Sequence, residues 1–178
     1  DVGARLGHGD MLSRTVTDVG ADTLGYQSLT DTFMASGALA QRGIVLDNGQ
    51  SYIYGYGGDM TGTAAGDFMI GDFGGERITG GGGDDAINGY GGSDTFVFGS
   101  GHGHDSVRDF GDDGADLLDL TAFGITSLES LAAAGGTITQ VAGNVVINLG
   151  AITGGGSITL IETDLTELDN GDFFGFGP

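Results

Sequence analysis

Large apolar residues recur at an interval of nine between residues 62 and 98. Written in nines from Gly62, the chain reads GTAAGDFMI, GDFGGERIT, GGGGDDAIN and GYGGSDTFV. The eighth place of these units is apolar: Met69, Ile78, Ile87 and Phe96. The sixth place is acidic: Asp67, Glu76, Asp85 and Asp94. After an insertion, SGHGHDSVR repeats the step with Asp105 and Val107. A fixed period of this kind indicates a repeat architecture.

Each unit is interpreted as a turn of six residues followed by a strand of three. Glycine adopts positive φ without steric cost, so the first part of the unit can form a tight turn. Side chains alternate along a strand, which sends the eighth residue to one face and its neighbours to the other. Two units make one coil of eighteen residues, so equivalent turns should stack at every second repeat. A glycine-rich linker is the alternative, and the fixed apolar register argues against it.

The flanking segments carry other patterns. Leu29, Phe33 and Leu39 stand loosely at helical spacing, which predicts a short helix within 28–41. The stretch 44–56 predicts two strands around Asn48-Gly49, a hairpin turn signal. We interpret the region before the repeats as a cap or linker that protects the edge of the first coil.

Three patterns follow the repeats. Thr126 and Glu129 have the spacing of a capping box and predict a short helix over 126–134. NVVINL and SITLIE predict two strands. The terminal FFGFGP is an apolar tail that packs as core in the folded chain and is a possible export signal in the unfolded one.

The amino-acid composition gives the chain a large negative charge. The 178 residues include 25 acidic and 5 basic ones, for a formal net charge of −20. Such a chain repels nucleic acid and anionic membranes. Apolar residues make up 39 % of it, with ten Phe and five Tyr, too many for a disordered tail. Cysteine is absent, and no apolar run approaches the ~20 residues that span a bilayer. We therefore expect bound cations to neutralise the carboxylates.

Stacking brings the acidic places together, with Asp67 above Asp85 and Glu76 above Asp94. Carboxylates about 5 Å apart repel each other unless a cation lies between them. Calcium takes six to eight oxygen ligands at about 2.3–2.6 Å, which carboxylates and turn carbonyls can supply. The candidate calcium ligands are Asp67, Glu76, Gly81, Gly83, Asp85, Gly92, Asp94, Asp105, Asp109 and Asp116.

Several candidate sites have a plainer alternative. Asp109, Asp112, Asp113 and Asp116 form either a further calcium site or an acidic solvated loop. His102 and His104 could hold a transition metal, but two loop histidines with no Cys or third ligand nearby are more often plain surface. Tyr52, Tyr54 and Tyr56 could form a binding face, although packing is the more frequent reason for such a pattern.

The repeat resembles the nonapeptide G-G-x-G-x-D-x-U-x of the RTX (repeat-in-toxin) proteins, where U is a large apolar residue. GGGGDDAIN fits at every defined place, and GYGGSDTFV departs only at Tyr90. GDFGGERIT has Asp72 and Glu76 where the pattern has glycine and aspartate, and GTAAGDFMI lacks two glycines. The resemblance therefore favours calcium sites around Asp85 and Asp94.

The segments 94–125 and 144–176 resemble the carboxyl-terminal module of serralysin-type secreted metalloproteases. This resemblance implies an all-β fold, a right-handed parallel β-roll with flanking cap strands and one or two short helices. It also implies calcium between the turns and export by a type I secretion apparatus that reads a carboxyl-terminal signal. We expect three segments: a cap or linker at 1–61, the calcium-binding roll at 62–110, and a capping and secretion-signal region at 111–178.

No catalytic pattern accompanies the repeats. The sequence has no H-E-x-x-H, no G-x-S-x-G, no phosphate loop and no cysteine. We predict a non-enzymatic bacterial protein, secreted or associated with the cell surface, that folds on binding calcium and supports secretion and stability of a secreted protein. The alternative is a self-assembling structural or adhesive protein, a homo-oligomer or surface assembly built on the same roll.

Overall fold

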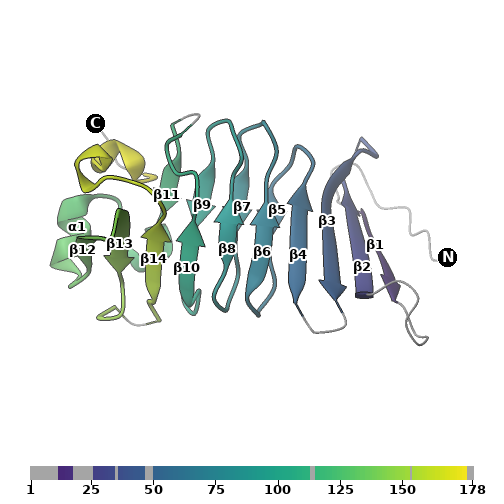
Figure 1. Cartoon of the computed structure of the whole chain (residues 1–178), viewed down its shortest axis with the longest axis horizontal. Helices are drawn as coiled ribbons and strands as arrows, with labels where there is room; N and C mark the ends of the chain where they lie inside the picture. Colours follow the sequence, from purple (N-terminus) through teal and green to yellow (C-terminus); the bar gives the residue numbers. More distant parts are fainter. Residues whose placement is uncertain are drawn as a thin grey trace.

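Two sheets dominate the computed structural model, which describes residues 12–17, 26–34, 36–46, 50–112, 115–152 and 154–175. The larger sheet has ten strands, in the spatial order β1 (Leu12–Thr17), β2 (Tyr26–Phe33), β3 (Leu39–Leu46), β4 (Ser51–Gly55), β6 (Asp67–Ile70), β8 (Ala86–Asn88), β10 (His104–Val107), β14 (Ser157–Leu160), β13 (Asn144–Asn148) and β12 (Thr137–Val141). The smaller sheet has four: β11 (Leu117–Asp119), β9 (Thr95–Val97), β7 (Arg77–Thr79) and β5 (Met60–Thr61). Figure 1 shows the strands side by side along the long axis of the molecule.

The chain alternates between the two sheets from β4 to β11. Strands β4, β6, β8 and β10 pair in parallel in the larger sheet, and β5, β7, β9 and β11 pair in parallel in the smaller one. Each strand is therefore followed by its equivalent one coil further on, as in a parallel β-roll. The predicted all-β roll is confirmed, and β6 to β9 lie at the strand places of the nine-residue units.

The eighth place of every unit faces the interior. Met69 pairs with Ile87 in the larger sheet, and Ile78 pairs with Phe96 in the smaller one. All four side chains are at most 1 % exposed. Burying one such side chain contributes about 1.5–3 kcal/mol to stability. The places on either side face outward, and Phe68 and Ile70 of β6 are exposed. Strand alternation thus fills the interior with one apolar side chain per unit.

Antiparallel strands extend the larger sheet at both ends of the roll. The predicted hairpin within 44–56 is confirmed by the antiparallel pair β3 and β4, while Asn48 and Gly49 lie outside the described residues. The strands predicted from NVVINL and SITLIE are β13 and β14, and β14 pairs in parallel with the last roll strand, β10. The proposed segment boundaries at residues 61 and 110 stay predictions.

The helix predicted within 28–41 is wrong. These residues form parts of β2 and β3, an antiparallel pair joined by a turn in which Gly37 has a φ of +85°. Leu29 and Phe33 are four residues apart, a spacing that fits one face of a helix and one face of a strand equally well. Thr30 and Thr32 lie between them, and β-branched side chains favour the strand.

The helix predicted over 126–134 is present as α1 (Leu128–Ala133). Its N-cap is Ser127 and the capping box pairs Ser127 with Ser130, one residue later than predicted from Thr126 and Glu129. Three short 3-10 helices complete the described chain: η1 (Thr121–Phe123), η2 (Leu165–Glu167) and η3 (Asn170–Asp172). Within the described residues, no helix has the length and apolar character needed to cross a membrane.

Groups outside the repeats contact both edge strands of the smaller sheet. At β5, the Gln41 side chain donates to the carbonyl of Thr61 at 2.8 Å and accepts from its N–H at 2.9 Å. At β11, the N–H of Phe174 donates to the carbonyl of Leu118 at 3.0 Å, and Phe173 is buried beside it. The first part of the tail, residues 173–175, therefore packs on the roll as predicted, while residues 176–178 lie outside the described residues. Because exposed strand edges invite pairing with other chains, these contacts protect the smaller sheet.

Glycine in the turns is required where coils approach each other. Gly81, at the second place of its unit, has a φ of +102°, and a Cβ there would lie 1.9 Å from the carbonyl oxygen of Thr63 in the preceding coil. Tyr90 occupies the same place one unit later and also has a positive φ, of 81°. The backbone therefore keeps its left-handed turn even where the sequence departs from glycine.

We expect Gly81→Ala to lower the free energy of unfolding by more than about 2 kcal/mol, because it combines a strained φ with a backbone clash. Thermal denaturation in the presence of calcium measures the change. Gly99→Ala is the matched control, since Gly99 has no positive φ and a Cβ there meets nothing within 4 Å. Equal stability of the two variants would contradict the close packing of these turns.

Candidate metal centre

The turns form two stacks, one on each side of the roll. We call row one the turns 62–66, 80–84 and 99–103, which lead to Asp67, Asp85 and Asp105. We call row two the turns 71–75, 89–93 and 108–112, which lead to Glu76, Asp94 and Asp116. All six acidic side chains are buried, at 1–6 % exposed. Each row therefore places three acidic side chains of successive coils in line.

Carboxylates within a row are joined through the backbone of the preceding coil. In row one, Asp85 Oδ1 accepts from the N–H of Asp67 at 2.8 Å, and Asp105 Oδ1 accepts from the N–H of Asp85 at 2.9 Å. The same contacts recur in row two, where Asp94 accepts from Glu76 and Asp116 accepts from Asp94, both at 2.8 Å. The structure thus has the stacking predicted for Asp67 over Asp85 and for Glu76 over Asp94.

The second carboxylate oxygen distinguishes the members of row one. Asp67 Oδ2 accepts from the N–H of Thr63 at 2.6 Å, and Asp105 Oδ2 lies 2.6 Å from His102 Nδ1. Asp85 Oδ2 is buried and has no hydrogen-bond partner in the described part of the chain. A buried polar atom without a partner destabilises the fold by about 1–3 kcal/mol. A ligand bound to this oxygen would remove that cost.

Backbone oxygens lie close to these carboxylates. A Cβ on Gly62 would lie 1.9 Å from the carbonyl oxygen of Gly80 and 2.7 Å from Asp67 Oδ2, and a Cβ on Gly80 would lie 2.2 Å from Asp85 Oδ2. The predicted ligands Gly83 and Gly92 are equally confined: a Cβ on either would lie 2.5 Å or less from backbone of the preceding coil. The turns therefore surround the carboxylates with backbone that only glycine allows to approach.

This set of groups suits a hard cation held mostly by oxygen. Among the described residues no three His, Cys, Asp or Glu side chains gather into a metal-binding group. A cation in either row would thus need carbonyl oxygens as well as carboxylates, which is the ligand type that calcium accepts. The unpartnered Asp85 Oδ2 fits such an ion.

The buried carboxylates have shifted acidities. Burial raises the pKa of Asp85 from 3.8 to about 7, with a further contribution from the charges of Asp105 and Asp67. Burial likewise raises the pKa of Glu76 to about 7 and that of Asp94 to about 6. The pKa of Asp116 is also raised by burial. Both rows therefore hold carboxylates whose neutral form is more favoured than in a free carboxylate, and a nearby positive charge would favour the ionised form.

The acidic segment after the repeats contacts the second turn of row two. Asp109 Oδ1 accepts from the N–H of Gly89 at 3.0 Å, and its Oδ2 accepts from the N–H of Tyr90. Asp112 is exposed, and Asp113 lies outside the described residues. Both oxygens of Asp109 thus bind backbone N–H groups, and the choice between a further calcium site and a solvated loop stays open.

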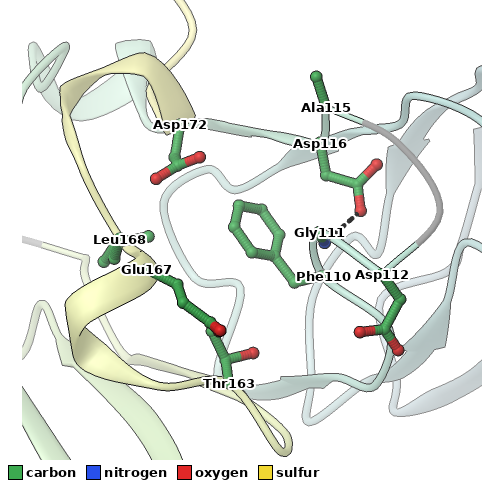
Figure 2. Close-up of a pocket in the computed structure, with 9 residues that line it drawn as sticks. All are labelled: Phe110, Gly111, Asp112, Ala115, Asp116, Thr163, Glu167, Leu168 and Asp172. Atoms are coloured by element: carbon green, nitrogen blue, oxygen red, sulfur yellow. Dashed lines mark hydrogen bonds between the residues drawn. The ribbon is translucent and has the colours of Figure 1, made fainter.

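A cavity of about 390 Å³ lies against the last carboxylate of row two. Figure 2 shows Phe110 at its centre, Asp112 and Asp116 on one side, and Glu167 and Asp172 on the other. Asp116 Oδ2 accepts from the N–H of Gly111 at 2.8 Å. Burial raises the pKa of Asp172, and the charges of Asp169 and Asp116 add to this effect. Row two therefore ends beside an acidic cavity formed with the carboxyl-terminal segment.

The two histidines differ in their surroundings. His104 is exposed, as expected, and its Nδ1 lies 2.8 Å from Ser157 Oγ. The expectation of a surface position is wrong for His102, which is 1 % exposed and lies between Asp105 and the carboxyl-terminal strands. The only sequence signal for its role is its place three residues before the acidic position of the unit.

The fold and these rows define a parallel β-roll with oxygen-lined turns on both sides. Comparison with protein-family models and with curated proteins finds no match. Among solved structures, the chain is similar to the AlgE6R3 subunit of the Azotobacter vinelandii mannuronan C5-epimerase, with 19 % identity, a TM-score of 0.42 and coverage of 67 % of this chain and 79 % of that one. It is also similar to the extracellular lipase LipA from Serratia marcescens, with 17 % identity and a TM-score of 0.39. That match covers 84 % of this chain and 29 % of the lipase.

Without calcium, we expect the roll to become less stable as pH rises from about 4 to 7. The pKa of Asp85 is near 3.8 in an unfolded chain and about 7 in the fold, so the folded state binds more protons over this range. Glu76 and Asp94 act in the same direction. Circular dichroism in chelator without denaturant measures the difference as a larger folded fraction at pH 5 than at pH 8, equivalent to more than about 2 kcal/mol.

Saturating calcium should remove this dependence, because the cation replaces the protons. The Asp85→Asn variant, which cannot ionise at this position, should lose part of the dependence. Greater stability at pH 8 than at pH 5 in chelator would contradict the burial of ionisable carboxylates in the rows.

Proposed function

We propose that this chain is an extracellular calcium-binding module that folds on binding calcium. The observation that carries the proposal is the buried Asp85 Oδ2, which has no partner in the described chain and lies against the backbone of turn 80–84, 2.2 Å from where a Cβ on Gly80 would stand. Its neighbours Asp67 and Asp105 are buried acids of the same row. A divalent cation would satisfy this oxygen and offset the charge of the row.

Each row would contribute a distinct set of ligands. Asp67 and Asp85 with the carbonyls of turns 62–66 and 80–84 would hold cations in row one, and Glu76 and Asp94 with turns 71–75 and 89–93 would do so in row two. Calcium would supply the positive charge that lets these acids stay ionised in a buried place. Since an ordered row exists only in the folded chain, the free energy of binding adds to the stability of the fold.

The same coupling supports a role in secretion. A chain with a net charge of −20 and 39 glycines resists folding where calcium is scarce, and it gains stability where calcium is abundant. We propose that the chain passes a type I secretion apparatus unfolded and then folds outside the bacterial cell, where it stabilises a secreted protein. The role includes no catalytic step, because the periodic carboxylates have a structural purpose in the roll.

Calcium titration tests this proposal, with circular dichroism following strand content. We expect strand signal to appear cooperatively with calcium and to disappear in chelator. Asp85→Asn should raise the calcium midpoint at least about tenfold, since a lost charge-assisted ligand costs about 1.5–3 kcal/mol. Asp59→Asn is the control, because Asp59 is an exposed acid outside both rows and its midpoint should stay unchanged. A wild-type chain equally folded in chelator would overturn the proposal.

The second candidate function, a self-assembling surface or matrix protein, is favoured by one feature. Aromatic rings lie at the surface of the early coils: the half-buried Tyr52 stacks on the exposed Phe68 at 5.2 Å, and Phe73, 81 % exposed, meets the exposed Tyr90 edge-on at 4.8 Å. Rings of this kind are enriched in protein interfaces. The contacts at both edges of the smaller sheet oppose end-to-end stacking of rolls.

Sedimentation with calcium at rising protein concentration separates the two functions. For a folding and export module we expect a monomer at every concentration. Reversible polymers that Phe73→Ser abolishes would favour assembly instead. Phe73→Ser should leave the calcium midpoint unchanged, because it keeps the backbone of turn 71–75 in row two and removes only a side chain that faces solvent.

A further inference from the structure

We propose that His102 is a positioning residue that holds the last carboxylate of row one and fastens it to the carboxyl-terminal strand β14. Ordering of row one by calcium would then also order the strands beyond the roll. This inference rests on the proposed function, because it assumes that row one binds calcium. The buried His102 side chain would couple calcium binding to the carboxyl-terminal cap.

Two hydrogen bonds fix the protonation pattern of the imidazole. The N–H of Gly156 lies 3.1 Å from His102 Nε2, and since a backbone N–H can only donate, Nε2 must accept. The ring proton is then on Nδ1, which lies 2.6 Å from Asp105 Oδ2 and donates to it. The ring thus uses one nitrogen for the row and the other for the segment that enters β14.

Aromatic packing fixes the orientation of the ring. His102 meets Phe98 edge-on with ring centroids 5.5 Å apart, and Phe123 edge-on at 6.0 Å. The side chain is 1 % exposed, so water cannot replace either of its hydrogen bonds without rearrangement. A ring held on two sides presents both nitrogens in fixed directions, which is what a positioning residue requires.

The carboxylate at the end of row one has a partner that the carboxylate inside the row does not have. Asp85 Oδ2 is left without a partner, whereas the equivalent oxygen of Asp105 is paired with the imidazole. The row therefore offers an unpaired carboxylate oxygen inside and a neutral N–H donor at its end. In this position the imidazole N–H satisfies an oxygen that would otherwise need a cation.

The backbone of β14 also contacts row one beside His102. The N–H of Ser157 donates to the carbonyl of Gly103 at 3.0 Å, and a Cβ on Gly156 would lie within 1.7 Å of that oxygen. His104 and Ser157 begin the parallel pairing of β10 with β14. The imidazole therefore bridges the row and β14 where that pairing starts. Ordering of row one would then also order β14.

Two substitutions separate the two halves of this bridge. His102→Asn keeps a donor near the place of Nδ1, for Asp105, but is too short to accept from Gly156. His102→Gln places its amide near Nε2, so its oxygen can accept from Gly156, but it leaves no donor at the place of Nδ1 for Asp105. His104→Asn is the matched control, since His104 is two residues away, exposed, and contacts Ser157 of the same strand.

Amide hydrogen exchange on the full chain, with calcium chloride and with chelator, gives the readout. In the wild type, calcium should slow exchange both in row one and from Gly156 to Leu160. We expect His102→Asn to keep protection of row one within about threefold while exchange of the Gly156 amide becomes about tenfold faster. His102→Gln should keep the Gly156 amide protected relative to His102→Asn and weaken calcium binding about tenfold. His104→Asn should resemble the wild type.

The imidazole ¹⁵N spectrum of the calcium-bound wild type should show the proton of His102 on Nδ1 and none on Nε2. If both His102 variants keep wild-type calcium-dependent protection at Gly156, or if both lose protection uniformly over the whole chain, the coupling role is overturned. If calcium fails to protect row one even in the wild type, it is the proposed function that fails. The ¹⁵N pattern and the Gly156 amide in chelator then still decide whether His102 forms the bridge.

Discussion

Repulsion between stacked carboxylates is the constraint on which the rest of this structure depends. A parallel roll places each residue above its equivalent one coil further on, so an acid at a fixed place of the repeat becomes a line of acids. Backbone N–H groups satisfy one oxygen of most of these side chains, but burial still raises the pKa of Asp85, Glu76 and Asp94. Hydrogen bonds alone therefore do not compensate the charge, which is why we propose that cations bind in the rows.

The period of the sequence predicted the roll and the alignment of its acids because both depend on residues a fixed number of positions apart. Met69, Ile78, Ile87 and Phe96 needed only strand alternation to be placed in the core. The segment 28–41 was predicted incorrectly since Leu29 and Phe33 satisfy two periods at once, and pairing with a neighbouring strand decided between them. His102 could not be placed because its partner Gly156 is 54 residues away, in a segment with no repeat to set the register.

The two rows end in different ways, and the difference follows from what packs against them. Row one meets an imidazole fixed by Phe98 and Phe123, so its end is closed by a neutral donor. Row two ends at Asp116 beside a cavity that Glu167 and Asp172 also line (Figure 2). The carboxyl-terminal segment thus seals one row and forms an acidic opening next to the other, although both rows come from the same repeat.

The contacts of Gln41 and Phe174 with the edge strands of the smaller sheet bear on how such a protein can change in size. The Gln41 side chain hydrogen-bonds to Thr61 of the first strand of that sheet, and the backbone N–H of Phe174 hydrogen-bonds to Leu118 of the last, while the Phe174 ring also lies against Arg77 of β7. Neither hydrogen bond depends on how many coils lie between the two edge strands. A duplication of eighteen residues would lengthen the roll by one coil and add one acid to each row, while both terminal contacts could form as before. The architecture therefore separates the number of coils from the design of the two ends, and a family of longer and shorter rolls could share the same terminal segments.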